Sequence, residues 1–286
     1  MRLAHLIIAH QNPQMLERLV KRLKHPDADI FIQLDRKTNI IGFKYIEDNG
    51  YASFIINRVN ITPGCYSFVQ AVINGFREIL KNGRNYSHIN LLSSQDYPLK
   101  PVSEIHRFLF NNADKTFMHI SHIPYQWPEG MQRLNKFSLC NTALPWQSNL
   151  EHLANSILPK REMPYHLAPY GRSQWFTITP LCAQYAINFL LNKPRLKSFF
   201  KYTRGVDELF FQTILMNSGL KKSIVNDGLR YIEMDSEDKP AVLTTADAGK
   251  LLSSGKLFAR KFDADASNTV LTCLDDIICE KKAGTI

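Results

Sequence analysis

Residues 1–100 alternate between the pattern of a buried strand and the pattern of an amphipathic helix, and this alternation constrains the fold most. Residues 3–9 and 30–34 are continuous apolar runs with the length of buried strands. Between them, Asn12 and Pro13 are typical of a helix start. One apolar stripe follows at helical spacing: Met15, Leu16, Leu19, Val20 and Leu23. A helix over 68–80 and a strand over 87–92 repeat the order, which predicts an α/β fold with a parallel or mixed sheet flanked by helices.

The pattern weakens over residues 111–170 and returns afterwards. The weak stretch has no long period and is interpreted as a variable insertion. Beyond it, the periodicity predicts strands over 174–179 and 229–234, and helices over 180–191, 207–217 and 269–280. No linker-like segment interrupts the chain. We therefore expect a single large domain, although 286 residues would also allow two.

Polar clusters follow several of the predicted strands. They occupy residues 33–37, 93–97, 206–208 and 258–263. A turn, a helix cap or a solvated basic edge would explain any one of them. Their recurrence matters more, because ligands of open α/β sheets bind at the carboxyl ends of the strands.

Charge and cysteine content limit the partners and the compartment. The formal net charge is +9, which favours anionic partners such as nucleic acid, acidic lipids or phosphorylated small molecules without choosing among them. Five widely separated cysteines without a C-x-x-C spacing predict neither a disulfide framework nor a zinc site, and they favour the cytosol. No apolar run reaches the roughly 18 residues of a membrane span, and the start does not resemble a signal peptide.

Seven sequence blocks, in this order, resemble a known enzyme family. They read LAHLIIAHQNPQMLERLVKRL, FIQLDRK, GCYSFVQA, INLLSSQDYPLK, SQWFTIT, VDELFFQTI and LFARKFD. The family is that of the core-2/I-branching N-acetylglucosaminyltransferases and peptide xylosyltransferases, glycosyltransferase family 14. The resemblance extends from Met1 to Cys279 and is weakest over 111–170. Seven ordered blocks are far more specific than any one of them.

The resemblance implies a fold and a reaction. The fold would be GT-A-like, with a nucleotide-sugar-binding half over 1–110 and an acceptor-binding and catalytic half over 111–286. The reaction would be inverting transfer of a sugar, N-acetylglucosamine or xylose, from a UDP-sugar to a hydroxyl of a glycan acceptor. Animal members are Golgi membrane proteins rich in cysteine. This chain therefore resembles a bacterial-type catalytic domain, expected in the cytoplasm, with peripheral contact to the inner membrane during surface polysaccharide synthesis.

The resemblance assigns the catalytic base to Glu208. An inverting transfer needs one carboxylate to take the proton of the attacking hydroxyl. The alternative is that Asp207 and Glu208 cap a helix, because carboxylates favour helix N-termini. A helix dipole at that place would also weaken the base unless burial opposed it.

The resemblance assigns the leaving diphosphate to basic side chains. Lys261 matches the family's diphosphate lysine. The position of a second basic residue falls on Asp238, so Lys239 or Arg260 is expected to replace it. The strings Asp27-Ala28-Asp29 and Asp263-Ala264-Asp265 do not follow a central strand. We therefore expect no metal and no cofactor.

The remaining site residues follow from strand ends and from the family blocks. His10, Asp35 and Arg36 are expected to bind the nucleotide, and Asp96, Ser173, Gln174 and Trp175 the sugar or the acceptor. Purely structural alternatives stay open. His10 would be an ordinary strand-end histidine, Asp35 a turn residue and Trp175 a core residue. The pair His119 and His122 is interpreted as structural, because no third ligand accompanies it.

The basic surface supports a second class of function. A non-catalytic protein that binds anions or nucleic acid would also carry a charge of +9. The basic residues are spread along the chain and no nucleic-acid module is recognisable, so we expect no nucleic-acid partner. A sugar-binding pseudoenzyme is the third alternative, and the retained Glu208 speaks against it.

Overall fold

The computed structural model describes residues 1–142, 145–237 and 239–283, and its N-terminal elements are those that the sequence predicts. Strand β1 (Arg2–Ala9) is followed by helix α1 (Pro13–Leu23) and strand β2 (Ala28–Leu34). The Asn12 side chain caps α1 by accepting a hydrogen bond from the Met15 amide at 3.1 Å. The predicted apolar stripe of α1 is buried, so the helix packs against the sheet as its period requires.

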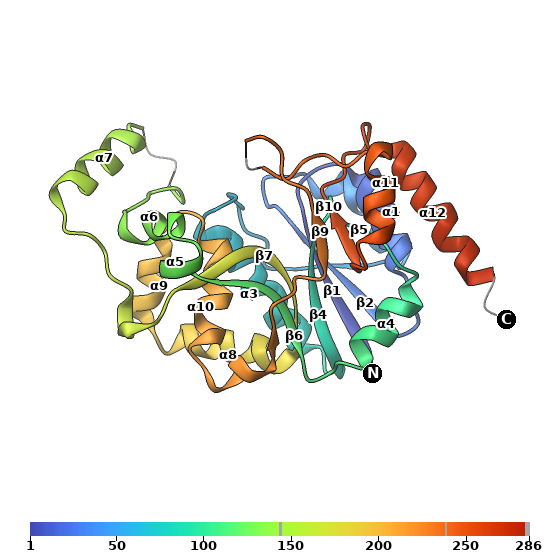
Figure 1. The fold of residues 1–286 in the computed structure, drawn as a ribbon, viewed down its shortest axis with the longest axis horizontal. Coiled ribbons are helices and arrows are strands. Elements are labelled where there is room, and N and C mark those ends of the chain that lie inside the picture. Colours follow the sequence, from blue (N-terminus) through green and yellow to red (C-terminus); the bar gives the residue numbers. More distant parts are fainter. Residues whose placement is uncertain (143–144, 238, 284–286) are drawn as a thin grey trace.

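A seven-stranded mixed sheet forms the centre of the molecule (Figure 1). Its order is β3-β2-β1-β4-β7-β6-β8. The further strands are β3 (Ser53–Phe54), β4 (Tyr86–Ser93), β6 (Thr116–His122), β7 (Tyr170–Ile178) and β8 (Ile224–Val225). Strands β1 to β4 are parallel, and β7 runs antiparallel to both of its neighbours, β4 and β6. The mixed α/β sheet flanked by helices confirms the predicted fold class.

Strand β1 supplies the cores on both faces of the sheet, because successive side chains of a strand point to opposite sides. Leu6 and Ile8 pack with helices α3 (Tyr66–Lys81), α8 (Pro180–Leu191) and α10 (Phe210–Met216). Leu3 and Ile7 pack with α1 and α12 (Asn268–Ala283). Residues before and after position 110 share each core. The division into nucleotide-binding and acceptor-binding halves stays a prediction.

A small second sheet adjoins the carboxyl ends of the central strands. It contains β5 (Tyr97–Pro98), β10 (Phe258–Arg260) and β9 (Arg230–Ile232). The shorter helices are α2 (Tyr45–Asp48), α4 (Val102–Phe110), α5 (Ile123–Gln126), α6 (Glu129–Asn135), α7 (Gln147–Ile157), α9 (Pro194–Lys201) and α11 (Ala248–Ser253). Among the described residues, no helix is long and apolar enough to cross a bilayer.

Two segments differ from the sequence prediction. The stretch 111–170 is not wholly an insertion, because β6 lies inside the central sheet between β7 and β8. The predicted helix over 207–217 is interrupted: a 3-10 turn, η3 (Val206–Glu208), precedes α10. Glu208 therefore lies in the 3-10 turn, two residues before the first residue of α10, and not inside an α-helix.

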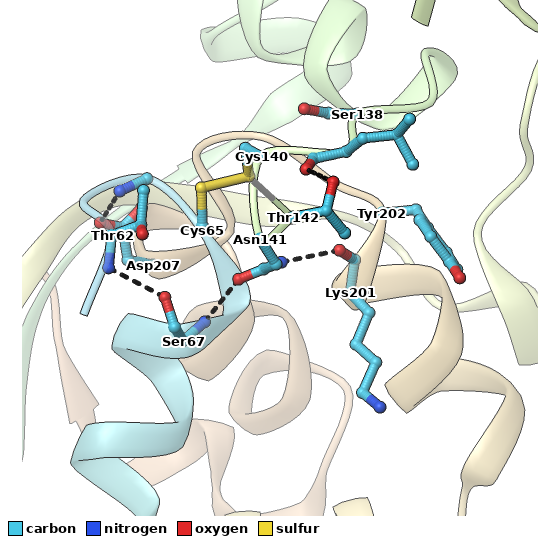
Figure 2. The surroundings of a disulfide bond; sticks show 12 residues. Thr62, Cys65, Ser67, Ser138, Cys140, Asn141, Thr142, Lys201, Tyr202 and Asp207 are labelled. Carbon is cyan, nitrogen blue, oxygen red and sulfur yellow. Dashed lines mark hydrogen bonds between the residues drawn. A yellow bond between two sulfur atoms is a disulfide. The ribbon is translucent and has the colours of Figure 1, made fainter. Parts of the chain in front are cut away.

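A disulfide joins Cys65 to Cys140 (Figure 2). The prediction of no disulfide was wrong for this pair, because residues 75 positions apart are paired only by the folded chain. The bond ties the N-terminus of α3 to the segment before α7. Disulfides are typical of oxidising compartments, so the bond weighs against the cytosolic location that the cysteine spacing favoured.

Candidate active site

One cavity of about 800 Å³ collects most of the predicted site residues. Its lining includes Ser173, Gln174, Trp175, Glu208, Arg260 and Lys261. They come from three distant segments: the start of β7, the turn η3 and the end of β10. The volume lies within the roughly 300–1,000 Å³ of small-molecule sites.

The direction of β7 explains why these segments meet. Because β7 is antiparallel to β4, its first residues lie beyond the carboxyl end of β4. Gly171 on β7 then approaches the η3 turn so closely that an added Cβ would lie 2.6 Å from the Glu208 carbonyl oxygen. The absence of a side chain at Gly171 therefore sets the position of Glu208 in the cavity wall.

We expect Gly171→Ala to lower the free energy of unfolding by about 1–3 kcal/mol, because the new methyl group would overlap the backbone of η3. Urea unfolding measures this change. Gly228→Ala is the matched control, since a Cβ there would have its nearest neighbour at 3.8 Å. Equal stability of the two variants would contradict the close packing of β7 against η3.

Arg133 on α6 is the cavity residue that most changes the surroundings of Glu208. Its guanidinium pairs with Glu208 Oε2 and lies 4.8 Å from the centre of the Trp127 ring. Glu208 lines the cavity, and its Oε1 has no hydrogen-bond partner among the described residues. Arg133 and Trp127 belong to the aperiodic stretch 111–170, which is why sequence reasoning missed them.

Asp207, next to Glu208, is buried and has a structural role. Its Oδ2 accepts hydrogen bonds from the Gly64 amide at 3.0 Å and from the Gln174 side chain at 2.5 Å. Burial, and then the neighbouring Glu208 carboxylate, raise the pKa of Asp207 to about 6. Gly64 also accepts a 2.6 Å hydrogen bond from the Gly205 amide. The close backbone approach at Gly64 thus serves a contact within the chain.

We expect Asp207→Asn to stabilise the protein at neutral pH. The pKa of Asp207 is about 6 in the folded chain and has an ordinary value of 3.8. The folded state therefore binds the proton more tightly, and stability of the wild type falls as pH rises through this window. The amide of the variant does not ionise. The stability that the variant gains over the wild type therefore grows with pH and reaches about 3 kcal/mol above the pH range between the two pKa values. Urea unfolding at several pH values measures it, and a variant less stable than the wild type at neutral pH would contradict the buried, destabilised carboxylate.

Two neighbouring side chains hold Arg260 in the lining of the cavity. Its Nε lies 3.1 Å from Asp96 Oδ1, and its guanidinium lies 4.4 Å from the centre of the Trp175 ring. Burial raises the pKa of Asp96, and the Arg260 guanidinium opposes this shift. Asp96 thus orients the Arg260 guanidinium. Trp175 is only 4% exposed, so its main role is to support that guanidinium. Direct sugar contacts of Asp96 and Trp175 stay predictions.

Lys261 lines the cavity, whereas Lys239 does not. Among the described residues Lys261 forms no ion pair, so its ammonium group is available to a ligand. Lys239 is exposed and pairs with Glu237 at 2.5 Å. Asp238, where the family pattern places its second basic residue, lies outside the described residues. Arg260 is therefore the second cation that the structure brings beside Lys261.

The predicted nucleotide residues lie elsewhere on the same edge of the sheet. His10 and Arg36 are exposed after β1 and β2, and neither lines the cavity. Asp35 is buried, and its Oδ1 accepts hydrogen bonds from the amides of Lys37 (3.0 Å) and Ile61 (3.3 Å). These contacts fit the alternative role of Asp35 as a turn residue. Nucleotide binding by the three residues stays a prediction.

One carboxylate of each D-x-D string is engaged within the chain, and none of the four aspartates lines the cavity. Asp29 accepts hydrogen bonds from Arg2 and Tyr86 at the opposite edge of the sheet. Asp263 Oδ1 accepts from the amides of Asp265 and Ala266. Across residues 1–142, 145–237 and 239–283, no group of three His, Cys, Asp or Glu side chains has the arrangement of a metal site.

Comparisons with known proteins show which proteins this chain is similar to. Xylosyltransferase 2 of Rattus norvegicus is 25% identical over 307 residues, covering 96% of this chain and 33% of the relative. The xylosyltransferase of Ciona intestinalis is 23% identical over 301 residues, with 96% and 34% coverage. The chain therefore spans about a third of the length of these curated relatives. The apo structure of mouse xyloside xylosyltransferase 1 aligns over 90% of this chain and 97% of its own, with 8% identity and a TM-score of 0.42.

A family model matches most of the sequence. The model described as Core-2/I-Branching enzyme matches residues 3–250, which include the strands of both sheets except β10. The predicted resemblance is thereby confirmed, and this chain belongs to the Core-2/I-Branching enzyme family.

Proposed function

We propose that the protein is a glycosyltransferase that moves a sugar from a UDP-sugar to a hydroxyl of a glycan acceptor, with inversion at the anomeric carbon. The observation that carries this proposal is the shared cavity of Glu208, Arg260 and Lys261. One wall carries a carboxylate with an oxygen free of hydrogen bonds to the described residues. The same cavity is lined by Arg260 and Lys261, together with Arg133 and Arg172. Membership of the family supports sugar transfer as the reaction.

In the proposed step, Glu208 Oε1 takes the proton of the acceptor hydroxyl while its oxygen attacks the anomeric carbon. The bond from that carbon to the phosphate oxygen breaks on the opposite face, and its electron pair leaves with UDP. Arg260 and Lys261 hold the negative charge that develops on the diphosphate. Because Asp96 and Trp175 already fix Arg260, little reorganisation accompanies the reaction. The proposal needs no metal ion.

The donor sugar is proposed from the family and its members. Curated relatives are named xylosyltransferases, which favours xylose, and N-acetylglucosamine is the alternative. Measuring UDP release from UDP-xylose and UDP-N-acetylglucosamine with glycan acceptors tests the function, and NMR of the product tests the expected β-linkage. Release of UDP with a product of unchanged anomeric configuration would contradict inversion. Binding of UDP without release for any donor would favour the non-catalytic alternative.

A further inference from the structure

Helix α7 exposes its apolar face to solvent, whereas an ordinary surface helix buries that face. Its apolar side chains follow Trp146 at intervals of four, three and four residues, which places them in one stripe. Trp146 is 76% exposed, Leu150 44%, Leu153 56% and Ile157 71%, and no residue of α7 is buried. A surface helix normally buries such a stripe. Figure 1 shows α7 projecting beyond α6, at the outer end of the molecule.

The polar face of α7 is the one that contacts the protein. Glu151 Oε1 accepts hydrogen bonds from the Leu139 amide at 2.5 Å and from Ser138 Oγ at 3.2 Å. Asn155 accepts from the Phe137 amide at 2.7 Å and donates to the Phe137 carbonyl at 2.9 Å. These four hydrogen bonds fix the rotation of the helix, so the outward direction of the apolar stripe is built into the fold.

The segments that carry α7 are themselves fixed. The disulfide from Cys140 reaches Cys65, and Asn141 bridges the Ser67 amide and the Lys201 carbonyl (Figure 2). On the other side of α7, the buried Arg161 donates to the carbonyl oxygens of Lys136 (2.9 Å) and Tyr202 (2.6 Å). The helix is therefore presented on a stiff support.

The stretch of sequence that contains α7 is strongly basic, although its Arg133 and Arg172 line the active-site cavity. Residues 130–206 contain ten Lys and Arg side chains and two carboxylates, those of Glu151 and Glu162. This stretch therefore accounts for eight of the nine net positive charges of the protein. Glu151 faces inward through its hydrogen bonds. Exposed cations of the stretch are Lys136, Lys160, Arg172, Arg195, Lys201 and Arg204.

We propose that α7 is a docking helix for the surface of an anionic lipid bilayer. An apolar stripe lying in the headgroup region, with cations around it, is the arrangement of interfacial helices. Each Lys or Arg near an anionic surface strengthens such binding, and tryptophan favours the membrane interface. A second copy of the chain fits less well, because a stable protein interface takes about 20–30 residues per side. The proposal goes beyond the reaction and does not depend on it.

Vesicle binding by the whole protein tests the proposal without any substitution. We expect cosedimentation with phosphatidylcholine vesicles that contain phosphatidylglycerol, much weaker binding to phosphatidylcholine alone, and loss of binding at high salt. Brominated lipids should quench tryptophan fluorescence, because Trp146 is exposed whereas Trp127 and Trp175 are buried. Absence of binding to anionic vesicles, or binding without quenching, would overturn the proposal.

Substitution of the stripe locates the contact. We expect the triple variant Trp146→Ser, Leu153→Ser, Ile157→Ser to weaken partitioning into anionic vesicles at least about tenfold. The matched control is Leu181→Ser, Leu191→Ser on α8, where the side chains are 65% and 64% exposed. Equal loss in both variants would overturn the assignment to α7. Concentration-dependent dimers of the wild type that disappear only in the triple variant would instead assign the stripe to a second copy.

Discussion

Glu208→Gln is expected to lower turnover by roughly 10²–10⁴, the range for loss of a general base, while UDP binding is retained. The amide keeps the size of the side chain and can still meet Arg133 through its oxygen, but it cannot accept the proton of the acceptor hydroxyl. Steady-state UDP release measures turnover, and calorimetry measures the affinity for UDP. Turnover within a few-fold of the wild type would contradict the assignment.

Glu129→Gln is the matched control for this experiment. Glu129 lies on α6 and is the second carboxylate among the lining residues of the same cavity. We expect its amide variant to retain turnover, because the family pattern assigns the base to Glu208. A large loss in Glu129→Gln together with an active Glu208→Gln would move the base to α6.

Lys261→Ala is expected to weaken UDP binding at least about tenfold while uridine binding changes little. The ammonium group of Lys261 forms no ion pair with the described residues, so its charge is available to the diphosphate. A charge-assisted hydrogen bond to a phosphate is worth about 1.5–3 kcal/mol, and uridine lacks that partner. Calorimetric titration with both ligands measures the difference.

Lys81→Ala serves as the control, because Lys81 is an exposed lysine at the C-terminus of α3. Its removal changes the net charge by the same amount as the removal of Lys261. If both variants weaken UDP equally, the effect comes from overall charge. If Lys261→Ala weakens UDP and uridine equally, the diphosphate role is wrong.

The periodic parts of the chain could be predicted from sequence because their packing is local. The stripe of α1 and the bounds of α8 agree with the structure, since each helix buries one apolar face in the core. The prediction of a helix over 207–217 was wrong at its start. Asp207 is buried and bonded to the Gly64 amide, so a contact across 143 residues takes the chain out of α-helical geometry there.

The site could be predicted where a compact sequence block that resembles the family carries the chemistry. Glu208, Arg260 and Lys261 stand in compact sequence blocks, and the structure brings them to one cavity. Arg133 and the disulfide of Cys140 come from the aperiodic stretch 111–170, where partners are set by tertiary packing. Spacing along the chain therefore carries no signal for them.

The central claim is that Glu208 activates the acceptor while Arg260 and Lys261, without a bound cation, hold the departing diphosphate. The most direct measurement is the rate of UDP release by the wild type after exhaustive treatment with EDTA, compared with the rate after Mn²⁺ or Mg²⁺ is restored. The account predicts the same rate in both conditions. A rate that falls to background with EDTA and recovers with the metal would contradict it.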